Sequence, residues 1–316
     1  MYSIAVVIPN HKRPNLLERL LTSIFATTFP ESLIGIWVVE NGGKAGAEDI
    51  CQRFNTRFPV HYCYSEMANL SNARNVGAQN AKADFIIFFD DDLRCDNNTL
   101  VAYDASIQQY GHSCFYGGPL GIDYEEKPSE WLMKYLPCSV QGLDEGSEHM
   151  LFDKPVFLGG NHAVARDKLL QIGGYDLHSA GGEGEESAMG EEYRLQQRLL
   201  DDGLKGSYNP NANVWHFVPK ERCSETWAHQ RFYRSGLTLG IFDSKKGADS
   251  SAVFLGAPRW IWKQYWLLRL KRFFSKLTNA EKYENLFKMK HEAARLKGII
   301  DGYRLERDKQ KNTYNQ

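Results

Sequence analysis

Short apolar runs alternate with amphipathic segments through the first third of the chain. Residues rich in Val, Ile and Phe form the runs SIAVVIP (3–9), LIGIWVVE (33–40), VHYCYSE (60–66) and DFIIFFDDD (84–92). Between them lie NLLERLLTSIFA (15–26), AEDICQRFNTRF (47–58) and NLSNARNVGAQNAKA (69–83). Strands buried on both faces are continuously apolar, and their alternation with helices is typical of parallel βαβ units. The pattern predicts an α/β fold with a mostly parallel sheet and helices on both faces.

Polar side chains follow three of these runs at the point where each predicted strand ends. Asn10 and His11 follow the first, Glu40 and Asn41 the second, and Asp90 to Asp92 the fourth. Ligands of open α/β sheets bind outside the carboxyl ends of the strands. We therefore expect these residues to gather at one binding edge.

The second third of the chain has a mixed pattern. It predicts strands at CFYGG (114–118), KPVFLGGNHAVA (154–165) and NANVWHF (211–217), and a helix at EEYRLQQRLLDDG (191–203). This part is best interpreted as the second half of the same globule. We predict one domain over 1–240, with halves 1–112 and 113–240, and a helical, basic and aromatic extension over 256–316.

Composition narrows the class of protein. The chain has 316 residues, 42% of them hydrophobic, and a net charge of -1, so its overall charge argues neither for nucleic acid nor for bulk attraction to an anionic surface, and any electrostatic partner must bind locally. Six scattered cysteines without paired spacing favour a reduced, cytoplasmic compartment. The first apolar run lacks a preceding basic segment, so we expect a first strand and no signal peptide. No apolar stretch reaches 18 residues, which argues against a spanning helix.

Three consecutive carboxylates end the fourth strand. At an effective dielectric near 20, each close pair of like charges costs about 4 kcal/mol at roughly 4 Å. Mg²⁺ and Mn²⁺ prefer carboxylate oxygens and often share their remaining ligands with phosphates and water. Asp90 to Asp92 therefore favour a metal–diphosphate site. The alternative is a solvated acidic turn before a helix capped by Asp96 or Asn97.

Five segments together resemble glycosyltransferase family 2. They are VVIPNHKRPNLLERLLTSI, WVVENG, NLSNARNVGAQNAKADFIIFFDDDL, FLGGNHAVARDKLLQIGGYD and GEEYRLQQRLLDDG, in the family's order over residues 3–236. The resemblance implies a GT-A, Rossmann-like fold and inverting transfer from a nucleotide-sugar. It also implies a nucleotide-binding first half and an acceptor-binding second half.

The resemblance further implies roles for single residues. Asp92 and Asp90 would hold a divalent cation, and Glu40 would meet the uracil ring, although Glu40-Asn41-Gly42-Gly43 departs from the usual Asp-Asp-Gly-Ser. The residues expected at the nucleotide are Pro9, Asn10, His11, Arg13, Glu40, Asn41, Arg74, Asp90 and Asp91.

The family's catalytic Glu-Asp pair falls on Glu191 and Glu192. The second position departs from the usual Asp, which moves the carboxylate by roughly 1 Å, one methylene. A base at a helix N-terminus is held rigidly, and the helix dipole would lower its pKa. Glu185 and Glu186 form a second candidate pair, with an acidic loop as the alternative; we favour Glu192 because its segment continues into an amphipathic helix.

Further candidates complete the predicted site. His216 follows a late strand, where some relatives hold the metal with a histidine, although a structural histidine is the alternative. Gly160, Asn161 and His162 resemble the segment that lines the donor-sugar and acceptor pocket. Trp131 would stack on a sugar face or serve a core or lid role.

The segment RWIWKQYWLLRLKRFFSK (259–276) holds six Lys or Arg and no acid. At helical spacing, an aromatic and apolar stripe forms on it, with most basic residues beside the stripe. This pattern suits the headgroup region of a membrane, so a peripheral location at the inner face of the plasma membrane is expected. Packing on the catalytic domain or homodimerisation is the alternative.

Three other functions compete with a sugar transfer. A sugar-1-phosphate nucleotidyltransferase needs a Gly-rich basic loop after the first strand, where this chain has PNHKRP. An aspartate-based phosphatase would place its motif on the first strand. A catalytically silent nucleotide-sugar or glycan-binding subunit of the same fold is the remaining alternative. Residue types do not select the sugar, the nucleotide or the acceptor, which would be a glycan or a lipid- or protein-linked glycan.

Overall fold

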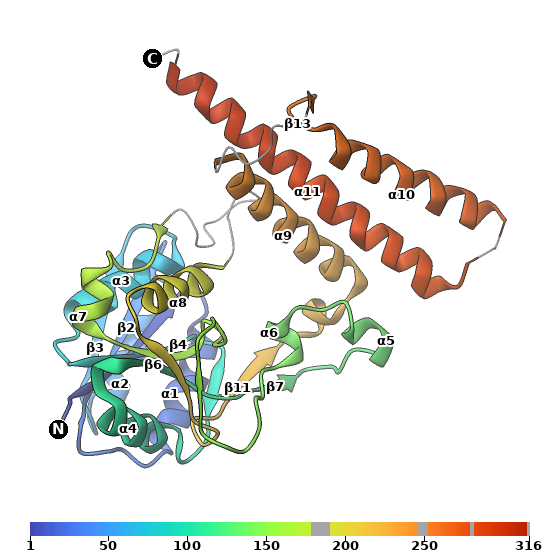
Figure 1. Cartoon of the computed structure of the whole chain (residues 1–316). Helices are drawn as coiled ribbons and strands as arrows, with labels where there is room; N and C mark the ends of the chain where they lie inside the picture. Colours follow the sequence, from blue (N-terminus) through green and yellow to red (C-terminus); the bar gives the residue numbers. More distant parts are fainter. Residues whose placement is uncertain (178–189, 246–251, 279–280, 315–316) are drawn as a thin grey trace. The chain divides into compact units, whose positions relative to one another are not determined.

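The computed structural model describes residues 1–177, 190–245, 252–278 and 281–314 (Figure 1). They form two compact units. The first comprises 1–125, 138–177 and 190–218, and the second comprises 126–137 and the described residues from 219 onward. The expected boundary at residue 240 lies inside helix α9 (Glu225–Lys245). The functional division of the chain into halves stays a prediction.

An eight-stranded sheet forms the centre of the first unit. Its first four strands in the chain pair in parallel, as the apolar runs predict, and a strand antiparallel to its neighbours follows. The spatial order is β3 (Val60–Ser65), β2 (Leu33–Asn41), β1 (Ile4–Asn10), β4 (Phe85–Phe89), β9 (Asn161–Ala165), β6 (Cys114–Gly117), β10 (Lys205–Tyr208) and β8 (Met150–Phe152).

Helices cover both faces of this sheet, which confirms the predicted α/β class. Alternate side chains of β1 enter different clusters: Ile4, Val6 and Ile8 face one layer, and Ala5 and Val7 face the other. The first layer contains α1 (Pro14–Phe25), α2 (Ala47–Phe54) and α4 (Thr99–Tyr110). The second contains α3 (Leu70–Asn80), α7 (Arg166–Gln171) and α8 (Glu191–Asp201).

Helix α1 shows why the periodic segments fold as predicted. Pro14 opens the helix, where its fixed φ and missing N–H are tolerated. Leu17, Leu20, Leu21 and Ile24 recur at intervals of three and four and are buried. Each such side chain contributes about 1.5–3 kcal/mol when fully buried. Helix α1 therefore docks on the sheet through one apolar stripe.

A small second sheet extends the binding edge of the first unit. Its order is β5 (Leu93–Cys95), β11 (Val214–Val218) and β7 (Leu120–Tyr124). Strand β5 directly follows the aspartate run, and His216 of β11 is paired with Leu93. This pairing brings residues more than a hundred positions apart beside Asp92. The short helix α6 (Cys138–Gln141) also belongs to this unit.

The second unit is mostly helical, which confirms the predicted helical extension. It contains α5 (Glu130–Met133), α9, the hairpin β12 (Val253–Phe254) and β13 (Ala257–Pro258), α10 (Arg259–Leu277) and α11 (Tyr283–Tyr314). Helix α11 packs against both α9 and α10 (Figure 1). Among the described residues, no helix is both long and apolar enough to cross a bilayer.

Glycines let α9 and α11 approach each other closely. An added Cβ would lie 2.2 Å from the Ile299 oxygen if placed on Gly240, and 2.0 Å from the Tyr233 oxygen if placed on Gly298. These distances leave no room for a methyl group, so the helix backbones are in direct contact.

Candidate functional site

The three aspartates after β4 form ion pairs with two arginines from other elements. Arg13 contacts both Asp91 and Asp92, and its Nη1 lies 2.9 Å from Asp92 Oδ2. Asn10 Nδ2 donates to Asp91 Oδ2 at 2.7 Å. Arg74 Nη2 lies 2.7 Å from Asp90 Oδ1. The cationic partners expected from the sequence are therefore, in this structure, guanidinium groups.

Burial separates the three carboxylates into different environments. Asp91 is fully enclosed, and burial raises its pKa to about 7 although Arg13 opposes the shift. Asp92 is buried but slightly more exposed than Asp91, and the side chain of Asp90 is 29% exposed. Asp91 is therefore an interior group that fixes Arg13 and Asn10, whereas Asp90 retains access to solvent.

His216 faces Asp92, and a backbone carbonyl holds the opposite side of its ring. Its Nδ1 lies 2.7 Å from the Ser139 carbonyl oxygen, which only accepts hydrogen bonds, so Nδ1 carries the hydrogen. In the neutral ring, Nε2 is then an acceptor, and it lies 3.5 Å from Asp92 Oδ2. A carbonyl that fixes the ring through its other nitrogen is the usual support of a ligating histidine.

The types of donor at this strand end would suit a divalent cation. Asp92, Asp90 and His216 offer carboxylate and imidazole donors, which suit Mn²⁺, and the carboxylates also suit Mg²⁺. Over the part of the chain that is described, no three His, Cys, Asp or Glu side chains converge tightly enough to hold an ion alone. A cation here would therefore complete its shell with diphosphate and water, and it would compete with Arg13 for Asp92.

Arg74 joins the aspartates to the carboxyl pair of α8. It is completely buried, and its Nη1 donates to Glu191 Oε1 at 3.1 Å while Nη2 contacts Asp90 and the Gly159 carbonyl oxygen. An added Cβ on Gly159 would lie 3.5 Å from Glu192 Cδ. The sequence segments that hold Asp90, Gly159 and the Glu pair thus meet at one place.

The pKa of Glu192 is raised to about 7, opposite to the shift expected from the helix dipole. Burial is the main cause, and the charge of Glu191 adds to it. Both effects disfavour ionisation of Glu192 and outweigh the opposing effects of a backbone hydrogen bond and of the Arg74 charge. A carboxylate with a pKa near neutrality is suited to accept a proton at physiological pH. Glu185 and Glu186, the other candidate pair, lie outside the described residues.

The carboxylate of Glu40 accepts hydrogen bonds from other residues of the protein. Its Oε1 accepts from the backbone N–H of Ala45 at 2.6 Å and that of Ala47 at 3.4 Å, and Tyr62 donates to Oε2 at 2.7 Å. The carboxylate therefore caps α2. Its expected contact with a base stays a prediction, and it would have to be made beside these partners.

The neighbouring strand-end residues lie together as expected. Asn41 Nδ2 donates to the Asn10 carbonyl oxygen at 3.0 Å, and His11 Nδ1 lies 2.7 Å from the Asn41 oxygen. Asn10 Oδ1 is buried and has no hydrogen-bond partner among the described residues, so it offers an acceptor at this edge. Pro9, on β1, is buried and supports the edge from within.

Asn161 and His162 are interior residues in this structure, so their expected place in the lining of a substrate pocket stays a prediction. Asn161 donates to two backbone carbonyls and accepts from Tyr103, so its amide group is fully used. His162 stacks on Phe88 and bonds Tyr175, and burial lowers its pKa to about 3. Of that segment, Gly160 faces the site: a Cβ there would lie 3.0 Å from Asp90 Oδ2.

Trp131 is a half-buried residue of the second unit. Its ring makes edge contacts with Tyr135, Tyr283 and Phe287. These contacts fit a packing role, and stacking on a sugar stays a prediction.

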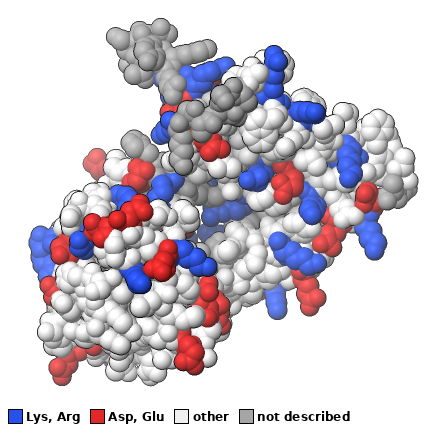
Figure 2. Space-filling view, viewed as in Figure 1, with Lys and Arg blue, Asp and Glu red and all other residues white. Residues whose placement is uncertain are grey.

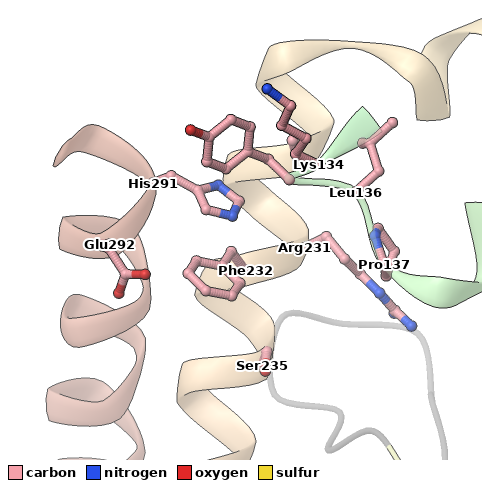
Figure 3. A pocket seen from close by; sticks show the side chains of 10 residues that line it. Lys134, Leu136, Pro137, Arg231, Phe232, Ser235, His291 and Glu292 are labelled. Carbon is pink, nitrogen blue, oxygen red and sulfur yellow. The ribbon is translucent and has the colours of Figure 1, made fainter. Parts of the chain in front are cut away.

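The second unit contains a cavity of about 450 Å³ that the sequence did not predict (Figure 3). Lys134, Arg231, Phe232 and His291 are among its lining residues. The His291 ring stacks on Phe232 with centroids 3.9 Å apart, and burial lowers its pKa to about 4. The cavity is therefore aromatic with cationic groups, and it shares no residue with the site around Asp90.

Tyr175 is a site residue that sequence reasoning missed. Its ring lies under the Arg74 guanidinium, 5.2 Å from the ring centroid, and its hydroxyl bonds His162. It follows the Gly-Gly turn of the fourth resembling segment, but its residue type alone does not distinguish it from a core tyrosine.

Comparison with known proteins identifies the family of the chain. The family model of Glycosyl transferase family 2 matches residues 5–172. The succinoglycan biosynthesis protein ExoM of Rhizobium meliloti is 25% identical over 77% of this chain and 76% of its own. The glucosyl-dolichyl phosphate glucuronosyltransferase of Haloferax volcanii is 24% identical over 76% and 77%.

Solved structures of low identity share the fold. A mannosyltransferase from Pyrobaculum calidifontis, in complex with GDP-Man and Mn²⁺, superposes with a TM-score of 0.53 at 17% identity, covering 80% of this chain and 66% of its own. TarS 1-349 of S. aureus superposes with a TM-score of 0.54 at 14% identity, covering 98% and 92%. The fold is therefore GT-A, and the chain belongs to glycosyltransferase family 2.

Proposed function

We propose that this protein transfers a sugar from a nucleoside diphosphate sugar, with UDP as the first candidate nucleotide, to a hydroxyl group of a glycan acceptor, inverting the anomeric configuration. The observation that carries the proposal is the position of Arg74. It joins Asp90, at the strand end, to Glu191 of the carboxyl pair. The residues that we propose for the diphosphate and a candidate base thus lie at one edge of the sheet.

Asp92 and Asp90, with Nε2 of His216, would hold a divalent cation. When bound, that cation would neutralise charge on the departing diphosphate. Support for this comes from two solved structures of the same fold, the mannosyltransferase with GDP-Man and Mn²⁺ and GalNAc-T7 with UDP, GalNAc and Mn²⁺. The second has a TM-score of 0.54 at 17% identity, covering 76% of this chain and 51% of its own.

Glu192 is assigned as the base. Its carboxylate would take the proton of the acceptor hydroxyl while that oxygen attacks the anomeric carbon from the face opposite the diphosphate. Arg74 holds Glu191 beside Glu192; the charge of Glu191 raises the pKa of Glu192, and the charge of Arg74 partly opposes this shift. No covalent enzyme intermediate is needed for a single displacement.

The acceptor is proposed from the relatives. The names of the two curated relatives refer to succinoglycan biosynthesis and to a glucosyl-dolichyl phosphate. We propose a growing surface polysaccharide or a lipid-linked glycan as the acceptor class.

Turnover distinguishes an enzyme from a silent binding subunit. Purified protein is incubated with UDP-sugars, Mn²⁺ and a mixture of lipid-linked or free oligosaccharides, and released UDP is measured. We expect release that requires Mn²⁺ or Mg²⁺, that stops with chelator and that is lost in Glu192→Gln. Metal-dependent nucleotide binding without any release, for every donor tested, would favour the silent subunit.

A further inference from the structure

Helix α10 exposes an apolar stripe on the side away from its packing partner. Ile261 and Tyr265 are buried in a cluster with Leu296, Ile299 and Ile300 of α11, so this side of α10 packs inside the unit. On the other side, large side chains point to solvent. They are Trp266, Leu267, Leu270, Phe273, Phe274 and Leu277, each more than half exposed.

The apolar surface continues at the adjacent hairpin. Val253, Phe254 and Leu255 are exposed at its turn, and the indole N–H of Trp262 donates to the Phe254 carbonyl oxygen, which ties the hairpin to α10. Leu255 has a φ of 44°, a conformation that costs energy for a leucine. Of twenty large apolar side chains exposed in the described residues, ten lie between residues 253 and 277.

Basic side chains border this stripe. At 100° per residue, Arg269 and Lys276 lie along one margin of the stripe and Lys271 along the other. Arg259 and Lys263 lie at its N-terminal end, and residues 259–276 contain no Asp or Glu. Figure 2 shows basic side chains recurring along the C-terminal helices.

We propose that α10 and the adjacent hairpin dock on an anionic lipid bilayer, with the helix lying in the headgroup plane. An apolar stripe with tryptophan and basic margins matches the chemistry of that interface. Charge favours lipid over a second copy of this chain, because two α10 faces would bring like charges together. This inference does not depend on the transferase reaction.

The full-length protein is tested by flotation with vesicles of phosphatidylcholine alone and with roughly 30% phosphatidylglycerol. We expect at least about tenfold tighter binding to the anionic vesicles, weakened by salt. Tryptophan emission should shift to the blue on binding, since Trp266 would leave water. The double variant Leu270→Glu, Phe273→Glu should lose binding, with an unchanged circular dichroism melt because both side chains are exposed.

Two control variants separate the contribution of the apolar stripe from that of the basic side chains. Leu170→Glu alters an exposed leucine of the first unit and should bind like wild type. Arg269→Glu with Lys271→Glu should lose the preference for anionic vesicles. The proposal is overturned if wild type binds neither kind of vesicle. It is also overturned if wild type and the Leu270→Glu, Phe273→Glu variant bind equally well. A wild-type dimer that this variant converts to a monomer, without vesicle binding, would identify the face as an interface between copies.

Discussion

At the residue scale, Glu192 is the group whose chemistry the structure constrains most. Because its pKa is raised to about 7, a base at this position is protonated and inactive in acid. We expect kcat/KM to fall about tenfold per pH unit below 7, with Mn²⁺ saturating. A profile that stays flat down to pH 5 would exclude Glu192 as the base.

Replacement of the base gives the corresponding test of activity. Glu192→Gln should reduce kcat by about 10²–10⁴-fold, because general base catalysis contributes about this much, and it should leave nucleotide affinity unchanged. Glu186→Gln is the matched control and should retain activity. A reversed result, with Glu186 essential and Glu192 dispensable, would move the base to the earlier pair.

The same raised pKa makes a prediction about stability. The folded chain binds the Glu192 proton more tightly than the unfolded chain, whose group has a pKa near 4.5. The stability linked to this group is therefore present below pH 4.5 and is lost as the pH rises through about 7. Glu192→Gln should raise the free energy of unfolding at pH 8 by up to about 3 kcal/mol and leave it unchanged at pH 4. Urea unfolding at both pH values measures this difference.

Arg74 should be required for both fold and activity. Arg74→Ala leaves Asp90 and Glu191 without their buried counter-charge, and such losses cost about 3–5 kcal/mol. Arg74→Lys keeps the charge but lacks the fork that reaches two carboxylates, so we expect an intermediate loss. Arg53→Ala breaks the exposed ion pair with Glu18 and should cost less than about 1 kcal/mol in the same urea experiment.

At the element scale, long periodic segments were predictable and short ones were not. The runs that became β1, β2 and β4 carry enough Val, Ile and Phe to predict burial on both faces, whereas β3 has a single Val and is a partly exposed edge strand. Strands β5 and β8 have three residues each, which is too short to show a period. Asn161 and His162 are buried because β9 lies inside the sheet, between β4 and β6, and apolar layers cover both faces of the sheet. Sequence spacing places a residue on a strand but does not report what covers it.

The close crossing of α9 and α11 also belongs to the element scale. Helix propensity alone predicts that Gly298→Ala stabilises the protein by about 1 kcal/mol. Contact with the Tyr233 oxygen predicts the opposite, a loss of about 1–3 kcal/mol, because the helices must separate. Arg234→Ala, at an exposed position of α9, should change the free energy of unfolding by less than about 0.5 kcal/mol. A more stable Gly298→Ala variant would contradict the packing described for this pair.

At the scale of the whole molecule, the sequence predicted which segments would form the site, and the structure supplied their partners. The strand-end aspartates and the Glu pair were identified from motifs, but their link through Arg74 depends on the fold. Arg13 was expected at the nucleotide, yet in this structure it holds Asp91 and Asp92. Three carboxylates at one strand end are thus stable before any ligand binds, and a donor with its cation would have to compete for Asp92.

The central claim, a cation-dependent diphosphate site at Asp90 to Asp92, is tested most directly by calorimetric titration of UDP with and without Mn²⁺. Wild type is compared with Asp92→Asn and with Asp202→Asn, whose carboxylate pairs with Lys168 on the surface. We predict binding that requires Mn²⁺, persists in Asp202→Asn and is lost in Asp92→Asn. Failure of UDP, GDP and dTDP to bind wild type with Mn²⁺, or unchanged binding in Asp92→Asn, would contradict the account.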